Sequence, residues 1–194
     1  TVNGKVIHRD WDYLQYFISE ARRLGLKVTV STAMFPSGHP ATREGLVYDE
    51  PRWDGKTCLE YTPGGKMLDI REDKKKVGAF LNPVRKDVRK FALSIVREIV
   101  KNYDVDAYAL DYCRYPGDDS DFSIDSQKAF ERYLGKKIQN FPDDIFTWNT
   151  DGTKKPGIYY KEWWAFRANV ITSFVKEVRK EIHSINKKVE LEYW

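Results

Sequence analysis

The sequence predicts an α/β fold, a section of a (β/α)8 TIM barrel with three parallel strands and long loops on the C-terminal face. Two observations predict it. Stretches with a helical spacing of apolar residues alternate with short apolar stretches typical of strands. The long irregular stretches follow the strands, whereas the helices lead into the next strand within a few residues. Barrel proteins build their sites from the loops that follow strands.

Apolar residues at intervals of three or four predict the helices. The first is capped by Asp10 or Asp12 and stopped by Gly25. The second begins after Asn82-Pro83, where proline fits a first helical turn. The predicted helices cover about residues 12–24, 83–103, 125–138 and 159–185.

Three strands are predicted, at residues 26–35, 105–111 and 188–194. Two long irregular segments, 36–82 and 112–156, follow the first two of them, and loops of such length are usually functional. Three strands cannot close a barrel, and a complete one needs about 250 residues. We therefore expect residues 1–194 to form a single partial barrel catalytic domain, with the remaining barrel segments in the same polypeptide.

Composition limits the classes of partner. Lys and Arg number 33 against 29 Asp and Glu, so the formal net charge of +4 is spread over many ionic residues. The longest basic run is Lys74-Lys75-Lys76, which does not favour nucleic acid as a partner. No apolar stretch approaches the roughly 20 residues that cross a bilayer, so no membrane span is expected.

Neither a metal nor another cofactor is expected. Cys58 and Cys113 have no metal-ligand spacing and are interpreted as small buried side chains, with a single disulfide left open as the alternative for an exported protein. The three histidines, His8, His39 and His183, are scattered. An acidic cluster lacks the spacing and the terminal Glu of a calcium-binding EF-hand, and its members are Asp118, Asp119, Asp121 and Asp125. Asp121 and Ser123 are expected to cap the following helix.

Asp111 is the principal catalytic candidate. It ends a buried strand, and a carboxylate at that end of a parallel strand faces the mouth where substrates bind. Arg114 and Tyr115 follow closely and are expected to keep the carboxylate ionised through a charge-assisted hydrogen bond. The alternative is a structural salt bridge between Asp111 and Arg114. Asp106, at the opposite end of the strand, is assigned a structural role.

Glu192 is the second catalytic candidate, because glycosidic bond hydrolysis needs two carboxyl groups. Alternation along the last strand places Glu190 and Glu192 on the same side. Glu192 lies nearer the C-terminal end and is the preferred general acid/base, although it could instead be a plain edge residue. Trp194 beside it offers a face on which a sugar ring can stack.

The remaining candidates are assigned to substrate binding. Aromatic rings pack against the C–H faces of sugars, and polar side chains bind their hydroxyl groups. Asn82 could instead cap the helix that follows it. The substrate-binding candidates are Asn82, Tyr112, Arg114, Tyr115, Trp53, Trp148 and Trp194.

Several motifs resemble the glycoside-hydrolase-like family 10 barrels, particularly the bacterial alpha-amylase-like members. They are Leu81-Asn-Pro before a helix, the segment from Tyr103 to Pro116 with Asp111-Tyr-Cys-Arg-Tyr-Pro, the segment Phe141 to Trp148, and Trp164-Ala-Phe-Arg167. The resemblance implies a (β/α)8 barrel acting on polysaccharide or glycoconjugate, usually outside the cytoplasm and often in a multidomain protein. An extracellular or periplasmic location is therefore expected.

The segment that ends at Asp111 is also similar to the fourth-strand motif of alpha-amylases, whose last Asp is the nucleophile. Ala109 and Ala107 stand where that motif has Arg and Gly, so the nucleophile role carries over by position only. The first hypothesis is a retaining O-glycosyl hydrolase with Asp111 as nucleophile and Glu192 as acid/base. The alternatives are a carbohydrate-binding barrel without turnover and, more weakly, a metal-dependent hydrolase that uses the acidic cluster.

Overall fold

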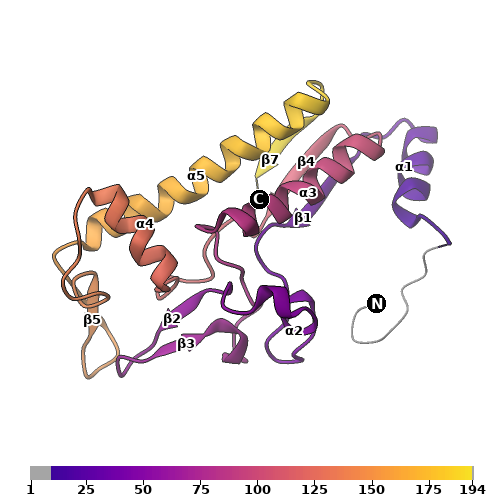
Figure 1. Ribbon diagram of the computed structural model, residues 1–194. Helices are drawn as coiled ribbons and strands as arrows, with labels where there is room; N and C mark the ends of the chain where they lie inside the picture. The colour runs from indigo at the N-terminus through magenta and orange to yellow at the C-terminus, as the bar shows by residue number, and fades with distance from the viewer. Residues whose placement is uncertain (1–9, 194) are drawn as a thin grey trace.

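The structure, a computed structural model, describes residues 10–193 (Figure 1). Its central sheet has three parallel strands in the order β1 (Thr29–Ala33), β4 (Ala107–Asp111) and β7 (Glu190–Tyr193). Helix α1 (Tyr13–Arg23) precedes β1, α3 (Lys86–Asn102) joins β1 to β4, and α5 (Tyr160–Ile185) joins β4 to β7. The predicted alternation of helices with parallel strands is therefore confirmed.

The two irregular segments contain short elements that the sequence did not predict. The first holds α2 (Leu46–Asp49), two single 3-10 turns at Pro51–Trp53 and Ile70–Glu72, and the hairpin of β2 (Leu59–Tyr61) and β3 (Met67–Asp69). The second holds the predicted helix, α4 (Ile124–Leu134), and the hairpin of β5 (Phe146–Trp148) and β6 (Lys154–Pro156). The prediction of plain loops was therefore wrong. The hairpins were missed because strands of three residues are too short to show an alternating pattern in the sequence.

Helix boundaries follow local chemistry. The Asp12 carboxylate accepts a hydrogen bond from the Gln15 amide and caps α1. Ser123 caps α4 in the same way, as predicted, with its hydroxyl accepting from the Ser126 amide. The predicted extension of α4 to residue 138 was wrong, because Gly135 adopts a left-handed conformation (φ 72°) and ends the helix.

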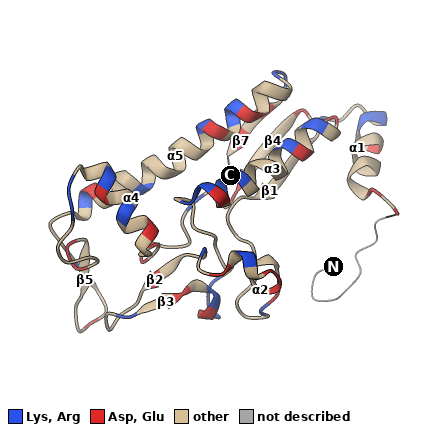
Figure 2. Ribbon diagram, viewed as in Figure 1, with Lys and Arg blue, Asp and Glu red and all other residues tan. Residues whose placement is uncertain are grey.

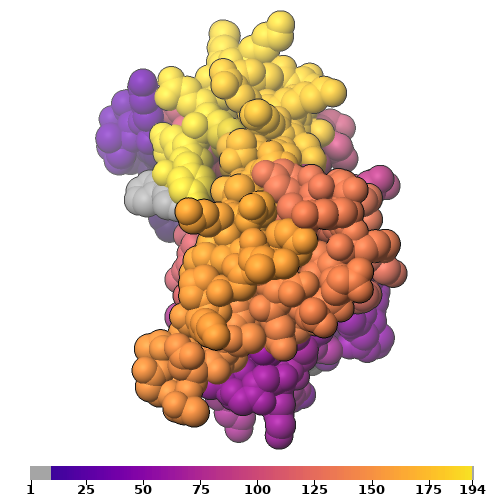
Figure 3. Space-filling view, turned by 90° about the vertical axis from the view of Figure 1, so that its left-hand side faces the viewer, coloured from indigo at the N-terminus to yellow at the C-terminus, as the bar shows by residue number. Residues whose placement is uncertain are grey.

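Two hydrophobic cores hold the molecule together. The first lies between the sheet and the helices α3 and α5, where Val96, Tyr108, Leu110 and Phe174 are fully buried. The second is mainly aromatic and lies between α4, the β5–β6 hairpin and the first half of α5. Figure 3 shows this second unit, in orange, between the C-terminal half of α5 and the segment that carries β2 and β3. No helix within residues 10–193 is long and apolar enough to span a membrane.

Asp106 has the structural role that the sequence predicts for it. Its carboxylate accepts hydrogen bonds from the Val28 amide at 2.7 Å and from Arg22 at 2.6 Å. These contacts hold the pKa of Asp106 below its ordinary value, the backbone hydrogen bond first and the Arg22 bond second. The bonds tie the end of α1 to the start of β4, which fixes the register of β1 beside β4.

Both cysteines are free and buried, so the structure contains the buried thiols of the main interpretation and no disulfide between Cys58 and Cys113. Burial raises the pKa of the Cys113 thiol to about 12 and that of Cys58 well above its ordinary value. At pH 8 a thiol with such a pKa is ionised in only about one molecule in 10⁴.

We therefore expect both thiols to react with iodoacetamide in the native protein on the order of 10³-fold more slowly than a free cysteine at pH 8. Alkylation is followed on the two peptides that carry Cys58 and Cys113 by mass spectrometry, with the protein in urea as the fully reactive control. Rapid labelling of either peptide in the native protein, or recovery of the two peptides as one disulfide-linked species, would contradict the structure.

Candidate active site

The strand register sorts the side chains of the sheet onto two faces. Tyr108 and Leu110 of β4 belong to the core beneath α3 and α5, so the alternate residues Ala109 and Asp111 lie on the opposite face. Parallel pairing places Ser31 beside Ala109, and Ala33 beside Asp111. This second face is the side that lines the interior of a barrel when helices cover the outside.

Glu192 shares that face with Asp111. It pairs with Ala109, and Glu190 pairs with Ala107, so both glutamates lie on the face opposite the helices. Ala109 is two residues before Asp111, which makes Glu192 and Asp111 diagonal neighbours on adjacent strands. From strand spacing and rise, their Cα atoms are roughly 8 Å apart. Ala109, which lies next to both residues, has a small side chain and is fully buried.

Both carboxyl groups are half-buried. A hollow of about 540 Å³ runs along the edge of β7 and is lined by Glu190, Glu192 and Tyr193, among others. Glu192 is therefore accessible from that side. Asp111 lies at the very end of β4, where the Met34 amide donates to its backbone carbonyl at 2.9 Å and extends the pairing of β1 and β4 by one step.

The chain turns sharply after Asp111. Tyr112 has a φ of 46°, in the left-handed region, which costs a non-glycine residue about 1–2 kcal/mol. The Tyr112 amide donates to the Asp111 carboxylate at 2.8 Å and so fixes one of its oxygens. Tyr112 itself is held by Phe80, whose ring meets it edge-on with the centroids 6.0 Å apart. Strain of this kind concentrates at functional positions.

The expectation that Arg114 pairs with Asp111 is wrong, both as a catalytic contact and as a structural salt bridge. The Arg114 guanidinium donates to the Tyr115 carbonyl at 3.1 Å and lies over the Tyr112 ring, 5.0 Å from its centroid. Within residues 10–193 Asp111 has no ion-pair partner, and its one hydrogen bond through the side chain is the bond from Tyr112. Arg114 therefore stabilises the turn after Asp111 and does not contact the carboxylate.

Asn82 is also not available to a sugar. It is 1% exposed, and its amide donates to Asp121 at 2.5 Å and to Ser123 at 2.9 Å. Its own oxygen accepts from the Val84 amide at 2.9 Å, which closes the Asn82-Pro83 turn ahead of α3. The N-cap residue of α3 is Arg85, so the alternative prediction, that Asn82 caps this helix, was also wrong.

Two of the predicted aromatic platforms are buried. Trp53 is 3% exposed and packs against Phe91 with the ring centroids 4.9 Å apart. Tyr115 is 7% exposed and lies under the Arg167 guanidinium, 4.4 Å from the ring centroid. Because these rings are buried inside the protein, their assignment to sugar stacking is corrected.

The other two tryptophans differ from each other. Trp148 is half-buried in the second core, where its indole N–H donates to the Tyr61 carbonyl at 3.0 Å and Lys154 lies over its ring. Trp194 lies outside the described residues. Of the aromatic candidates, Tyr112 is therefore the one that the structure places beside Asp111.

The acidic cluster is divided among separate partners. Asp118 pairs with Lys154, and Asp119 with Lys76. Asp125 pairs with Arg85, and Asp121 is fully buried among hydroxyl and amide donors. Within the part of the chain that the structure describes, no group of three or more potential ligands gathers to hold a metal ion.

The fold and the strand-end acids define a class, a parallel α/β barrel section with two carboxyl groups on the face opposite the helices. The chain matches the family model described as Glycosyl hydrolase-like 10 over residues 4–192 and belongs to this family.

The chain is also 38% identical over 175 residues to the S-layer-related protein of Niallia circulans. The match covers 88% of this chain and 11% of that protein, so the chain spans about a tenth of its relative's length. Among solved structures it is similar to alpha-L-fucosidase isoenzyme 2 from Paenibacillus thiaminolyticus, with a TM-score of 0.61 and 16% identity. That likeness covers 95% of this chain and 23% of the fucosidase. It concerns the fold alone and confirms a section of a (β/α)8 barrel.

Proposed function

We propose that this chain is the partial barrel catalytic domain of an O-glycosyl hydrolase, with Asp111 as nucleophile and Glu192 as general acid/base. The observation that carries the proposal is the strand register, which supports two carboxyl groups as diagonal neighbours on one face. Retaining glycosidases use two carboxyl groups about 5–5.5 Å apart, and the side chains of diagonal neighbours can approach within that range. The remaining barrel strands, from the same polypeptide, would complete the pocket.

The reaction assigns each group a task. The Asp111 carboxylate attacks the anomeric carbon and forms a glycosyl ester as the glycosidic C–O bond breaks. Glu192 gives its proton to the departing oxygen, then removes a proton from the water that hydrolyses the ester. The amide of Tyr112 holds one Asp111 oxygen, which leaves the other to attack. Tyr112 is the residue proposed to contact the sugar at this position.

The substrate that we propose is a polysaccharide or glycoconjugate at the cell surface, and the location is extracellular or periplasmic. Membership of a glycosyl hydrolase-like family supports the sugar substrate. The location rests on the name of the S-layer-related relative. A carbohydrate-binding barrel without turnover is the weaker candidate, because Trp53 and Tyr115, two of the rings that it would use, are buried.

The proposal is tested by incubating the full-length protein with a panel of bacterial cell-wall polysaccharides and measuring the release of reducing ends. The control is the double variant Asp111→Asn/Glu192→Gln. We expect release from at least one polysaccharide by the natural protein and none by the double variant. Saturable binding without release by the natural protein would favour the binding barrel, and equal release by both proteins would place the chemistry elsewhere.

A further inference from the structure

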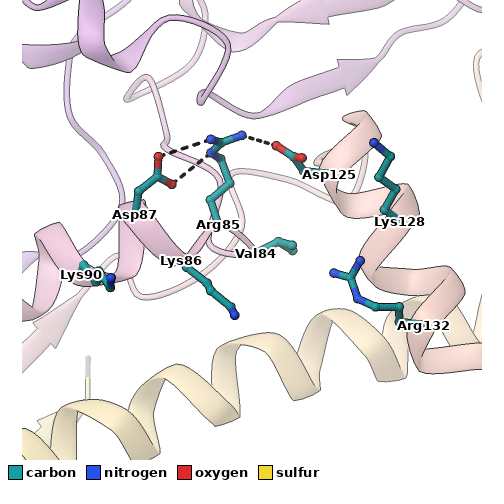
Figure 4. Close-up of a pocket in the computed structure, with 8 residues that line it drawn as sticks. All are labelled: Val84, Arg85, Lys86, Asp87, Lys90, Asp125, Lys128 and Arg132. Atoms are coloured by element: carbon teal, nitrogen blue, oxygen red, sulfur yellow. Dashed lines mark hydrogen bonds and ion pairs between the residues drawn. The ribbon is translucent and has the colours of Figure 1, made fainter.

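A basic groove runs between α3, α4 and α5, outside the site described above. Its centre is a pocket of about 430 Å³ lined from the start of α3 and from α4 (Figure 4). We define the groove by four cations that line this pocket: Lys86, Lys90, Lys128 and Arg132. Lys128 and Arg132 also line a second hollow of about 510 Å³ along α4. Lys86, Lys90 and Arg132 line a third, of about 410 Å³, toward α5. The three hollows share residues and form one continuous groove.

The four cations of the groove have no anionic partner among residues 10–193. Four carboxylates border the three hollows, and all are already paired. Asp87 pairs with Arg85 and Lys56, and Asp125 with Arg85. Glu131 pairs with Lys137, and Glu177 with Arg89. Figure 4 shows the Arg85 pairs on one side, with Lys86 pointing away from them and Arg132 extending from α4 toward Val84. Along α5, by contrast, basic and acidic residues are interspersed (Figure 2).

The cations form two rows. Lys86 and Lys90 are one helical turn apart on α3, and Lys128 and Arg132 are one turn apart on α4, so the neighbours within each row are about 5–6 Å apart. A single small anion could contact only one or two of these four cations. A ligand with several anionic groups along its length satisfies both rows, and the continuity of the hollows along α4 and toward α5 fits a chain molecule.

The floor of the groove is apolar. Val84, Leu93, Ala129 and Val170 line it where it approaches α5. An apolar floor between cationic walls matches sugar rings, which present C–H faces and carry charged substituents at their edges. None of the residues that line the three hollows is aromatic. The groove therefore lacks the rings on which the bases of single-stranded nucleic acids stack, and a glycan would be held there by charge and by the aliphatic floor instead of by ring stacking.

We propose that the basic groove binds an anionic polysaccharide, a glycan whose repeating units carry carboxylate or phosphate groups. This binding is separate from the proposed hydrolysis, since neither Asp111 nor Glu192 lines the groove. Such a site would hold the protein on an acidic cell-surface glycan while the strand-end carboxyl groups act on a substrate.

The test measures binding by the full-length protein to polygalacturonate, to a glycerol-phosphate teichoic acid and to neutral dextran, by affinity electrophoresis. We expect retention by one or both acidic glycans and none by dextran, and the two acidic probes separate carboxylate from phosphate recognition. The variant Lys128→Gln/Arg132→Gln should weaken retention by about tenfold or more, since two charge-assisted contacts are lost. Increasing NaCl from about 50 to about 500 mM should weaken the binding of the natural protein as well.

The matched control is Lys161→Gln/Lys180→Gln, which removes two exposed positive charges from α5, where neither residue lines the groove or the hollow beside Glu192. This control should bind like the natural protein. An equal loss in both variants, or no loss in the groove variant, would overturn the proposal. It would also be overturned by an oligonucleotide that binds as tightly as the glycans and depends equally on Lys128 and Arg132.

Discussion

We expect the variant Asp111→Asn to lose the proposed glycosidase activity by on the order of 10³-fold or more in kcat, because the neutral amide cannot form the glycosyl ester. The change conserves the shape of the side chain. The side-chain oxygen of the introduced asparagine can still accept the hydrogen bond that the Tyr112 amide donates at 2.8 Å, so the free energy of unfolding should change by less than about 1 kcal/mol. The measurement is kcat on the polysaccharide found by the panel, together with a urea unfolding curve.

Two companion variants separate a catalytic pair from a general charge effect. Glu192→Gln should lower kcat by about 10²–10⁴-fold, and by less for substrates with good leaving groups, which need little protonation. Glu190→Gln is the matched control, because Glu190 lies on the same face of β7 but at its opposite end, and it should stay within about twofold of the natural protein. Equal losses at Glu190 and Glu192 would refute the assignment of the acid/base.

Asp121→Ala should lower the free energy of unfolding by about 3–5 kcal/mol, the largest effect on stability that we expect from one substitution. Asp121 is fully buried, with one carboxylate oxygen accepting from the Leu59 amide at 2.6 Å and the other from Asn82 and two serine hydroxyls. Alanine removes the acceptor of the Leu59 amide and of both serine hydroxyls, and it leaves the Asn82 amide with only the serine oxygens to accept its hydrogen bonds. Asp121 makes hydrogen bonds to β2, to the Asn82 turn and to the start of α4, so the substitution removes contacts in three parts of the chain.

The free energy of unfolding of the Asp121→Asn variant should fall between that of Asp121→Ala and that of the natural protein. The oxygen of the asparagine can replace one carboxylate oxygen and the two serine hydroxyls can turn to accept, but its amide would meet the Asn82 amide, a second donor. The control is Asp118→Ala, since the side chain of Asp118 is 61% exposed and has one ion pair with Lys154, so less than about 1 kcal/mol is expected. Urea midpoints that order the three variants differently would contradict the account of the buried cluster.

The main elements could be predicted because they are long. Helices such as α3 and α5 run for 17 and 26 residues, over which the apolar stripe repeats many times and stands out against the polar face. Of the three strands in the sheet, β4 is buried on both faces and appears as a short apolar stretch, whereas β1 and β7 carry exposed polar residues and were predicted mainly from their position after a helix. The hairpins β2–β3 and β5–β6 repeat no pattern over three residues, and their position depends on packing with distant segments.

The candidate site was predicted in part for the same reason. Asp111 and Glu192 were selected as candidates from strand ends and alternation, which are local properties, and their catalytic roles stay predictions. Asn82 and Trp53 were misassigned because their partners, Asp121 and Phe91, lie 39 and 38 residues away along the chain. The cations of the basic groove were visible as pairs four residues apart on two helices. Nothing in the sequence indicates that the start of α3 lies near α4, so the groove between them could not be predicted.

The central claim, that Asp111 is the nucleophile, is tested most directly by trapping the covalent intermediate. The full-length protein is incubated with an activated 2-deoxy-2-fluoro glycoside of the sugar that the panel identifies, and its peptides are examined by mass spectrometry. The account predicts one glycosyl group, in ester linkage, on the peptide that carries Asp111, and none in Asp111→Asn. A glycosyl group on any other carboxylate, or a fully active enzyme that forms no ester, would contradict it.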